Sequence, residues 1–393
     1  MFNIAILGFG VVGCGTAEVL ESNKQSIKNK CGREINVKYI LDIRDFPDSP
    51  FADRIIHDAD IIFNDPEIDC CVETIGGARV AYEFTKRALS CGKSVVTSNK
   101  ELVSTKGVEL LKIAADNNCS YLFEAAVGGG IPIIRPLYRC LAANKIVKLC
   151  GIVNGTTNYV LSSMKYKGIS YDDALAQAKV NGYAEADPTA DVEGIDAQRK
   201  LSILSSIAME GRYIAPEKIE TVGISKVTLD DIKFADSINC QIKLIAYFKR
   251  EGDKCQVYVM PHFVSKDKLI GNVDDVFNAV VVEGDFVGET LFYGQGAGSL
   301  PTASAVCGDV IELSVNNKSE FVKPWEEDIN DSVISYSDVK ASFVFFNISN
   351  SEAFDSINVE RIADNAVVVN GINPSEAQSL SSKSGSSFMH YLA

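Results

Sequence analysis

Acidic and basic side chains concentrate in one stretch of the chain, from the turn-rich segment Gly182–Pro188 to Lys200. Glycine and proline interrupt any helix over the first part of this stretch. From Asp196 onward the apolar residues recur at intervals of three and four, which predicts a helix over 196–210. Asp196 and Lys200 then lie one turn apart on one helical face. A loop of carboxylates leading into a helix with one ammonium group could bind an amino acid and protonate a group beside it.

A simpler interpretation of the same stretch is a solvated acidic loop followed by a surface ion pair. Such a pair would contribute only ~0.3–0.5 kcal/mol to stability. The stretch by itself does not separate the two interpretations, so the elements that would position it matter.

The N-terminus predicts a dinucleotide-binding turn. An apolar strand over 2–7 leads into Gly8, Gly10 and Gly13, which open a helix that continues to about Lys28. In this context the first glycine makes a tight turn, the second lets backbone approach a pyrophosphate, and the third allows close helix–strand packing.

The cofactor preference depends on the residues after the second strand. Asp42 there could hold a free ribose hydroxyl, whereas Arg44 could accept a 2′-phosphate. The residues favour NADP, with NAD kept open.

Further strand and helix signals alternate over the first 130 residues, which predicts an α/β fold with a doubly wound parallel sheet, Rossmann-like. The expected strands are 37–41, 68–74, 94–97 and 120–124, and the expected helices are 79–91 and 103–117. Downstream, helices at about 132–143 and 156–167 and strands at 241–249, 256–260 and 279–284 predict an α+β domain with a largely antiparallel sheet. A second glycine-rich turn at 294–301 precedes a helix at 302–313, a polar linker at 316–330, strands at 341–348 and 366–369, and a serine-rich tail.

Bulk composition restricts the class of protein. The 393 residues are 46% hydrophobic and 23% charged, as in ordinary globular enzymes. A net charge of −14 argues against nucleic acid or an anionic membrane as partner, because both are polyanions. Neither a signal sequence nor a membrane-spanning run is expected. Eleven cysteines without a C-x-x-C pair predict reduced thiols in the cytoplasm, and the three histidines stand in unrelated contexts.

Seven sequence blocks, in this order, resemble homoserine dehydrogenase across residues 1–315: Gly8–Gly13, Thr97–Lys100, Glu124–Pro132, Asn154–Asn158, Gly182–Pro188, Asp191–Lys200 and Gly296–Ser304. The resemblance implies reversible reduction of L-aspartate 4-semialdehyde to L-homoserine by a nicotinamide cofactor. It also implies a cytoplasmic homodimer that serves threonine, methionine and isoleucine biosynthesis.

Aldehyde reduction needs an acid where the alkoxide develops, and Lys200 on its helix is the expected proton donor. Lys100, after the fourth strand, is expected to position the substrate beside the nicotinamide. We expect Glu185 and Asp196 to bind the substrate, Asp191 to orient Lys200, and Gly182 to allow close approach of backbone. The cofactor-binding residues are then Gly8, Phe9, Gly10, Val11, Val12, Gly13, Asp42, Arg44, Thr74, Ser98, Lys100, Gly182 and Gly298.

The resemblance further implies a monovalent-cation site, sodium, at Glu124 with backbone oxygens of Val127, Gly129 and Ile131. It also implies a dinucleotide-binding domain of residues 1–131 plus about 292–315 and a substrate and dimerisation domain of 132–291. Residues 321–393 would form a reduced regulatory (ACT-like) module. Because no clear first helix follows its first strand, feedback inhibition by threonine is in doubt.

Two other hypotheses stay open. Another two-domain amino-acid dehydrogenase acting at a carbon–nitrogen bond would share the fold, but it does not predict the carboxylate loop at this spacing from Lys200. A non-catalytic dinucleotide sensor would have no reason to retain both Lys100 and Lys200.

Overall fold

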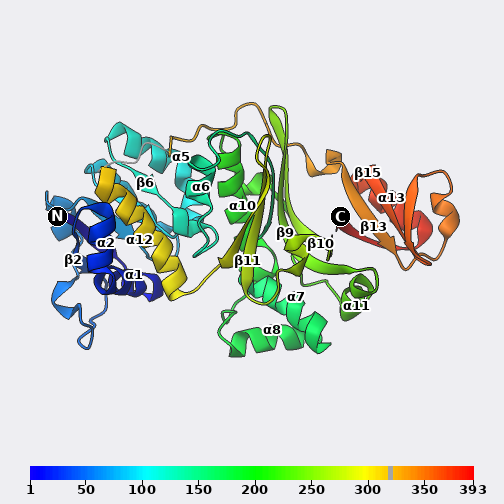
Figure 1. Ribbon diagram of the computed structural model, residues 1–393, viewed down its shortest axis with the longest axis horizontal. Helices are drawn as coiled ribbons and strands as arrows, with labels where there is room; N and C mark the ends of the chain where they lie inside the picture. The colour runs from blue at the N-terminus through cyan, green and yellow to red at the C-terminus, as the bar shows by residue number, and fades with distance from the viewer. Residues whose placement is uncertain (317–321) are drawn as a thin grey trace. The chain divides into compact units, whose positions relative to one another are not determined.

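The computed structural model describes residues 1–316 and 322–393, which divide into two compact units (Figure 1). The first unit consists of Met1–Lys145, Ser202–Pro216 and Gly294–Asp328. The second consists of Ile146–Leu201, Glu217–Tyr293 and Ile329–Ala393. Residues 317–321, within the predicted linker and at the start of the predicted C-terminal module, lie outside the described residues.

The first unit contains a six-stranded sheet in the order β3-β2-β1-β4-β5-β6, with every neighbouring pair parallel. Because its strands are nearly continuous apolar runs, both faces of the sheet can be buried. Strand order reverses between β1 and β4, the place where doubly wound sheets bind ligands. The predicted α/β class is confirmed. The strands are β1 (Phe2–Leu7), β2 (Ile35–Leu41), β3 (Ile55–Ile56), β4 (Cys70–Glu73), β5 (Ser94–Thr97) and β6 (Tyr121–Leu122).

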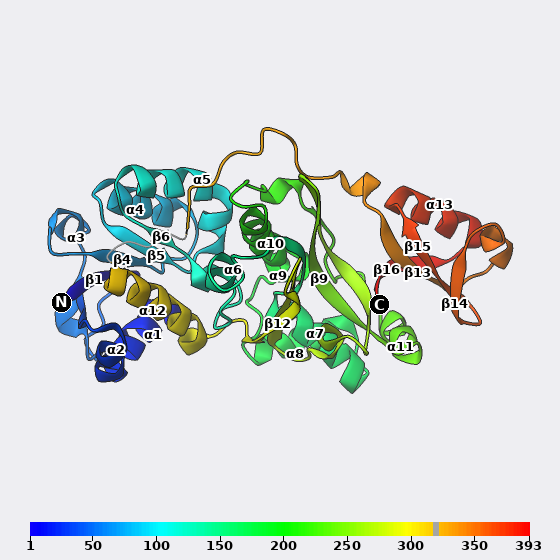
Figure 2. The same ribbon diagram turned by 45° about the horizontal axis from the view of Figure 1, so that its top comes forward.

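Helices of this unit include one from far along the chain. In Figures 1 and 2, α12 lies beside α1, and a Cβ on Gly15 of α1 would come within 2.8 Å of Ser299 Oγ. The helices are α1 (Val11–Ser22), α2 (Lys24–Cys31), α3 (Asp60–Asn64), α4 (Arg79–Ser90), α5 (Lys100–Asp116), α6 (Ile134–Tyr138) and α12 (Ser299–Asn316).

Two predicted helices of this unit differ from the structure. The first, predicted to run to Lys28, breaks at Asn23 into α1 and α2. The helix predicted over 132–143 is only the five-residue α6, since the chain turns after Tyr138.

The second unit is built on a ten-stranded, mostly antiparallel sheet in the order β12-β11-β7-β9-β10-β16-β13-β15-β14, with β8 also paired to β10. The two parallel pairs are β10 with β16 and β10 with β8. The strands are β7 (Ile146–Ile152), β8 (Glu220–Thr221), β9 (Cys240–Glu251), β10 (Lys254–Ser265), β11 (Phe277–Gly284), β12 (Gly288–Gln295), β13 (Ala341–Phe346), β14 (Val359–Ala363), β15 (Ala366–Ile372) and β16 (Ser387–Leu392).

Helices α7 and α8 pack against each other in this unit, and α7 also contacts β9 and β11. The helices are α7 (Gly155–Lys167), α8 (Tyr171–Val180), α9 (Thr189–Val192), α11 (Leu229–Ser237) and α13 (Pro374–Ser384). Helix α10 (Ile195–Ala208) begins in this unit, and its residues from Ser202 onward belong to the first. Short 3-10 turns occupy Ala52–Arg54, Glu124–Ala126, Pro216–Lys218, Leu269–Asn272, Tyr336–Asp338 and Ser351–Phe354.

The serine-rich tail, for which the sequence predicted no helix or strand, folds into α13 and β16. Asn373 and Glu376 form a capping box at the start of α13, while Ala377 and Leu380 face the core. The strands β13 to β16 with α13 follow a split β-α-β order in which a 3-10 turn stands in place of the first helix. The absence of a clear first helix there is therefore confirmed.

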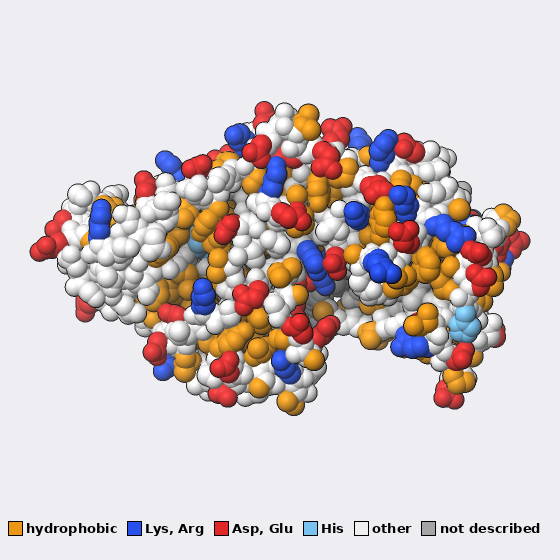
Figure 3. Space-filling view, turned by 180° about the vertical axis from the view of Figure 1, so that it is seen from behind, with side chains coloured by type: hydrophobic (Ala, Val, Ile, Leu, Met, Phe, Trp, Pro, Cys, Tyr) orange, Lys and Arg blue, Asp and Glu red, His pale blue; other side chains and the backbone are white. Residues whose placement is uncertain are grey.

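In the described residues, no helix is both long and apolar enough to cross a bilayer. On the face that Figure 3 displays, lysine and arginine side chains are scattered among acidic ones.

Candidate active site

The glycine-rich turn joins β1 to α1 as predicted. Gly8 has φ +95°, and Gly10 precedes the first residue of α1. A Cβ on Gly13 would lie 2.0 Å from the Gly8 carbonyl oxygen, so only glycine fits there. A Cβ on Gly10 would meet no protein atom within 4 Å. The third glycine therefore serves packing, while the second leaves open space at the helix N-terminus, where a phosphate binds well.

A cavity of about 440 Å³ lies at the carboxyl ends of the central strands. Its volume is in the range of small-molecule sites. It brings together five predicted cofactor residues and adds His57, which sequence reasoning had not assigned: Gly8, Gly10, Asp42, Arg44, Thr74 and His57. The position next to the strand-order reversal matches the place of dinucleotides in such sheets.

The other predicted cofactor residues of the first unit are not among those that line this cavity. Phe9 points its ring into the core, 3% exposed, against Phe46, while Val11 is exposed at the start of α1. Val12 and Ser98 are half-buried. Gly298, with φ +117°, directly precedes α12.

Asp42 is saturated by donors of its own unit. Its carboxylate accepts the Phe9 N–H at 2.8 Å and three bonds from Arg44 at 3.0–3.2 Å. The Arg44 guanidinium lowers the pKa of Asp42 to about 2. The Asp42 side chain is 7% exposed, whereas that of Arg44 is 59% exposed. Of the Asp42–Arg44 pair, the charge exposed at this rim of the cavity is therefore the basic one.

His57 adds to that basic rim. One ring nitrogen lies 2.7 Å from the Asp42 carbonyl oxygen and the other 3.0 Å from Asp45. These hydrogen bonds raise the pKa of His57, with the backbone contact to Asp42 the largest cause. Its spacing from Asp42 in the sequence gave no signal.

Lys100 lies at the carboxyl edge of the same sheet, as predicted. β5 ends at Thr97 and α5 begins at Lys100, with Asn99 as N-cap accepting the Leu102 N–H at 3.0 Å. The lysine is half-buried. The first turn of α5 thus fixes its backbone beside the strand ends.

Sequence reasoning missed Glu73, a fully buried acid at the end of β4. Its carboxylate accepts the Thr97 hydroxyl at 2.5 Å and the Ile75 N–H at 2.7 Å. Burial raises the pKa of Glu73 to about 7. The sequence signal for this residue was an acidic side chain at the end of an apolar strand.

In the second unit, the loop Gly182–Pro188 is largely exposed, and Glu185 lies on it with its side chain in solvent. Gly182 has φ +75°, which favours glycine. The Thr156 hydroxyl donates to the Tyr183 carbonyl oxygen at 2.6 Å and ties the loop to α7.

Asp196 and Lys200 form the predicted i,i+4 pair, at 2.7 Å, but as a buried pair with side chains 6% and 10% exposed. The surface-ion-pair interpretation is therefore wrong. Lys200 Nζ also donates to the Val153 carbonyl oxygen at 2.6 Å. Asn154 Nδ2 donates to Asp191 at 2.7 Å and to Asp196 at 2.9 Å. Asp196, expected to bind substrate, is thus itself bonded to Lys200, and Asp191 joins the pair through Asn154.

Glu124 stabilises the turn that, by the family resemblance, is expected to hold a cation. Its carboxylate accepts the N–H groups of Ile133, Ile134 and Arg135 at 2.6–2.8 Å and so caps α6. Across the described residues, no cluster of three or more His, Cys, Asp or Glu side chains could hold a metal ion. A cation in this turn would depend mainly on the backbone oxygens of residues such as Val127 and Gly129.

A glycine turn at the switch point of a doubly wound sheet, with a buried lysine–carboxylate pair in a second unit, defines a dinucleotide-dependent oxidoreductase. Residues 8–124 match the family model "Homoserine dehydrogenase, NAD binding domain", and residues 132–311 match "Homoserine dehydrogenase". The homoserine dehydrogenase of Pseudomonas aeruginosa is 45% identical over 311 residues, 79% of this chain and 71% of that protein. The chain belongs to the homoserine dehydrogenase family, and it is an NAD(P)-dependent oxidoreductase.

Further relatives agree over most of the chain. The homoserine dehydrogenase of Bacillus subtilis is 37% identical over 333 residues, covering 82% of this chain and 76% of that protein. A crystal structure of a homoserine dehydrogenase from Thiobacillus denitrificans matches with TM-score 0.90 and 34% identity, covering 99% of this chain and 98% of that one. A hyperthermophilic archaeal homoserine dehydrogenase in complex with NADPH matches with TM-score 0.68 and 30% identity, covering 80% and 98%.

Proposed function

We propose that the enzyme interconverts L-aspartate 4-semialdehyde and L-homoserine, with Lys200 as the proton donor and acceptor. The observation that supports this role is the buried Asp196–Lys200 pair, because a charged lysine out of water is retained only with a partner. A bound nicotinamide cofactor would supply or accept the hydride. Lys200 Nζ would protonate the oxygen on which charge develops during reduction and take the proton back during oxidation.

The other assignments follow the chemistry of each group. Glu185, exposed on its loop, would bind the substrate ammonium or hydroxyl, and Lys100 would position the substrate at the sheet edge. Asp196 would bind the substrate while holding Lys200, and Asp191 would orient the group through Asn154. Gly182 would admit close approach of backbone to the ligands.

The test follows absorbance of the reduced cofactor with homoserine, supplying NAD and NADP separately. Lys200→Ala should cut kcat by ~10²–10⁴ and leave cofactor binding near normal. Lys233→Ala, at an exposed lysine of α11 in the same unit, serves as the control. Full turnover by Lys200→Ala would remove the proposed role. Ammonia release from homoserine would support the carbon–nitrogen dehydrogenase, and cofactor binding without turnover would support the sensor.

We propose that NADP is the preferred cofactor. Asp42 already holds Phe9 and Arg44, so its oxygens are poorly placed to take a ribose diol, while Arg44 and His57 present positive charge to a 2′-phosphate. Arg44→Ala should raise the KM for NADP by roughly ten- to a hundredfold and change that for NAD little. Arg361→Ala on β14 is the control. An equal change for both cofactors would contradict the preference.

We propose sodium as a bound monovalent cation at the 124–131 turn. Glu124 there leaves one carboxylate lone pair beyond its three N–H donors, and Gly128 and Gly129, with φ +74° and +54°, turn the backbone sharply. Sodium chloride should raise the melting temperature more than choline chloride at equal ionic strength. Identical melting curves in the two salts would remove the site.

We propose a homodimer through the β12 edge of the second unit's sheet. An edge strand with exposed apolar side chains is a ready template for a second copy. Phe286, in the turn between β11 and β12, is 87% exposed, and Val287, Leu291 and Tyr293 in that turn and on β12 are exposed as well. Leu291→Arg should shift the mass measured by light scattering from dimer to monomer. A dimer that survives this change, or a wild-type monomer, would contradict the surface.

We propose that the enzyme acts in the cytoplasm, which its eleven free thiols support. We further propose that its product enters threonine, methionine and isoleucine biosynthesis. We also propose that residues 321–393 are a reduced regulatory module, supported by the split β-α-β order of β13 to β16. Titrating threonine against activity tests it, and a response retained after deletion of 329–393 would contradict it.

A further inference from the structure

Two carboxylates, the half-buried Asp191 and the buried Asp196, converge on the side chain of Asn154. Asn154 Nδ2 reaches both, at 2.7 and 2.9 Å, and Asp196 also accepts Lys200 at 2.7 Å. Asn154 is only 4% exposed. Two neighbouring carboxylates repel each other, so a neutral double donor between them holds both in place.

The orientation of this carboxamide is dictated by the helix that it caps. Asn154 is the N-cap of α7, and its Oδ1 accepts the Thr157 N–H at 2.8 Å. Since a backbone N–H can only donate, the carbonyl end of the amide must face the helix. The NH₂ end therefore faces the two carboxylates, with one N–H available for each.

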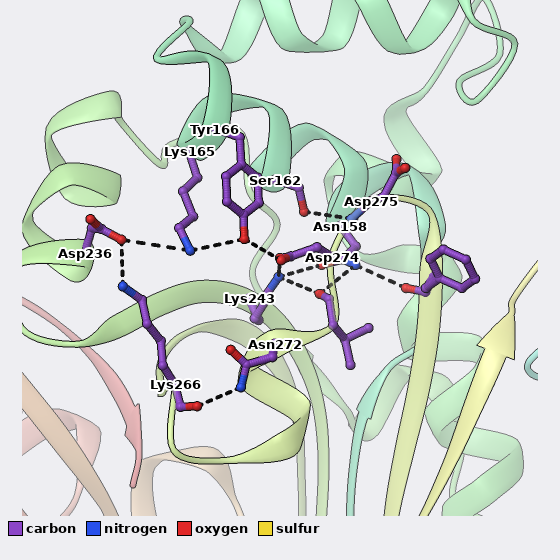
Figure 4. A network of polar contacts seen from close by, with 12 residues as sticks. Asn158, Ser162, Lys165, Tyr166, Asp236, Lys243, Lys266, Asn272, Asp274 and Asp275 are labelled. Carbon is purple, nitrogen blue, oxygen red and sulfur yellow. Dashed lines mark hydrogen bonds and ion pairs between the residues drawn. The ribbon is translucent and has the colours of Figure 1, made fainter.

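The start of α7 is itself held by a second asparagine, one turn along. Figure 4 shows Asn158, Lys243 and Asp274 meeting at the loop before β11. Asn158 Nδ2 donates to the Val273 and Phe277 carbonyl oxygens at 3.0 and 3.1 Å. Lys243, 1% exposed, donates to Asn158 Oδ1 at 3.2 Å and to Asp274 at 2.8 Å. Any shift of α7 along its axis would break these bonds.

We propose that Asn154 is a positioning residue for the Asp196–Lys200 pair, which rests on the proposed proton-transfer role of Lys200. The capped helix holds Asn154 in a fixed position. Its carboxamide donates one N–H to Asp191 and one to Asp196, and Asp196 then sets the direction of the Lys200 ammonium. Proton transfer depends steeply on such geometry, so the effect belongs in kcat rather than in cofactor binding.

Asn154→Ser tests this, because serine caps a helix about as well as asparagine but cannot bridge two carboxylates. We expect kcat with homoserine to fall roughly ten- to a hundredfold, with a smaller change in KM and unchanged affinity for reduced cofactor. The matched control is Asn373→Ser, the same change at the N-cap of α13, which should leave kcat unchanged. An ordinary cap would give the same result at both positions.

A double-variant cycle separates the positioning role of Asn154 from the proton-transfer role of Lys200 on which it rests. In the Lys200→Ala background, Asn154→Ser should reduce kcat little further, because the group it positions is gone. If Lys200→Ala has a low kcat while Asn154→Ser keeps full activity, only the positioning role is overturned. Equal losses with and without Lys200 would also overturn it, because Asn154 would then act elsewhere. A fully active Lys200→Ala would instead overturn the proton-transfer role.

Discussion

Glu73 provides the sharpest test of the electrostatics beneath the cofactor turn. The side chain is fully buried, and burial raises its pKa to about 7 against an ordinary value of 4.5. The unfolded chain therefore releases this proton at lower pH than the folded one, so the group costs stability as pH rises from 4.5 to 7 and the cost levels off above 7. At about 1.4 kcal/mol per pH unit the full cost is roughly 3 kcal/mol, with about 2 kcal/mol of it appearing between pH 5.5 and 8.

Glu73→Gln removes the titration while keeping an acceptor for the Ile75 N–H. Its free energy of unfolding relative to wild type should therefore rise by about 2 kcal/mol between pH 5.5 and 8. Urea unfolding followed by fluorescence reports on the right unit, because the single tryptophan, Trp325, belongs to it. Glu18→Gln, at an exposed acid on α1, is the control. A difference from wild type that does not change with pH would refute the burial argument.

Three further outcomes follow from the structure. Gly10→Val should fold normally yet lose cofactor binding in a fluorescence titration, because a Cβ on Gly10 meets no protein atom. Gly13→Ala should instead lower the melting temperature, because its Cβ would lie 2.0 Å from a backbone oxygen. The reverse pattern would contradict the assigned glycine turn. Glu185→Gln should change stability by no more than ~0.5 kcal/mol but lower kcat/KM for homoserine about tenfold to a few hundredfold, and unchanged kinetics would leave the loop a solvated surface. Burial lowers the pKa of His262 to about 4, so the stability that its neutral form contributes above pH 6.5 is lost as pH falls. The free energy of unfolding of wild type should fall by roughly 1 kcal/mol more than that of His262→Phe between pH 7.5 and 5.5, and parallel curves in urea unfolding would contradict this.

The parts of the fold that sequence predicts well are those with a strong local signal. The glycine turn and β5 appear where expected, and the antiparallel strands β9 and β10 are longer than their apolar cores suggested. α13 was missed because its serines mask a narrow apolar face at Ala377 and Leu380. Short elements such as β3 gain their stability from neighbouring strands, which no local pattern records.

The candidate site shows the same limit. Spacing alone placed Asp196 and Lys200 on one helical face, because i,i+4 geometry is local. Their burial, and the contacts with Val153 and Asn154, join segments more than forty positions apart. Partners that distant in sequence are set by the packing of α7 against its neighbours and could not be predicted from spacing.

The packing of α12 on α1 has a consequence for the order in which the chain folds. Ser299 donates to the Val11 carbonyl oxygen at 2.8 Å across 288 positions, and Val306, Val310 and Leu313 complete the core that β1 begins. During synthesis the core of the N-terminal sheet therefore stays incomplete until α12 is made, nearly three quarters of the chain later. Closing so long a loop is slow, and until then the apolar face of α1 stays open to chaperones or to aggregation. A fragment of residues 1–145 would carry that open face permanently.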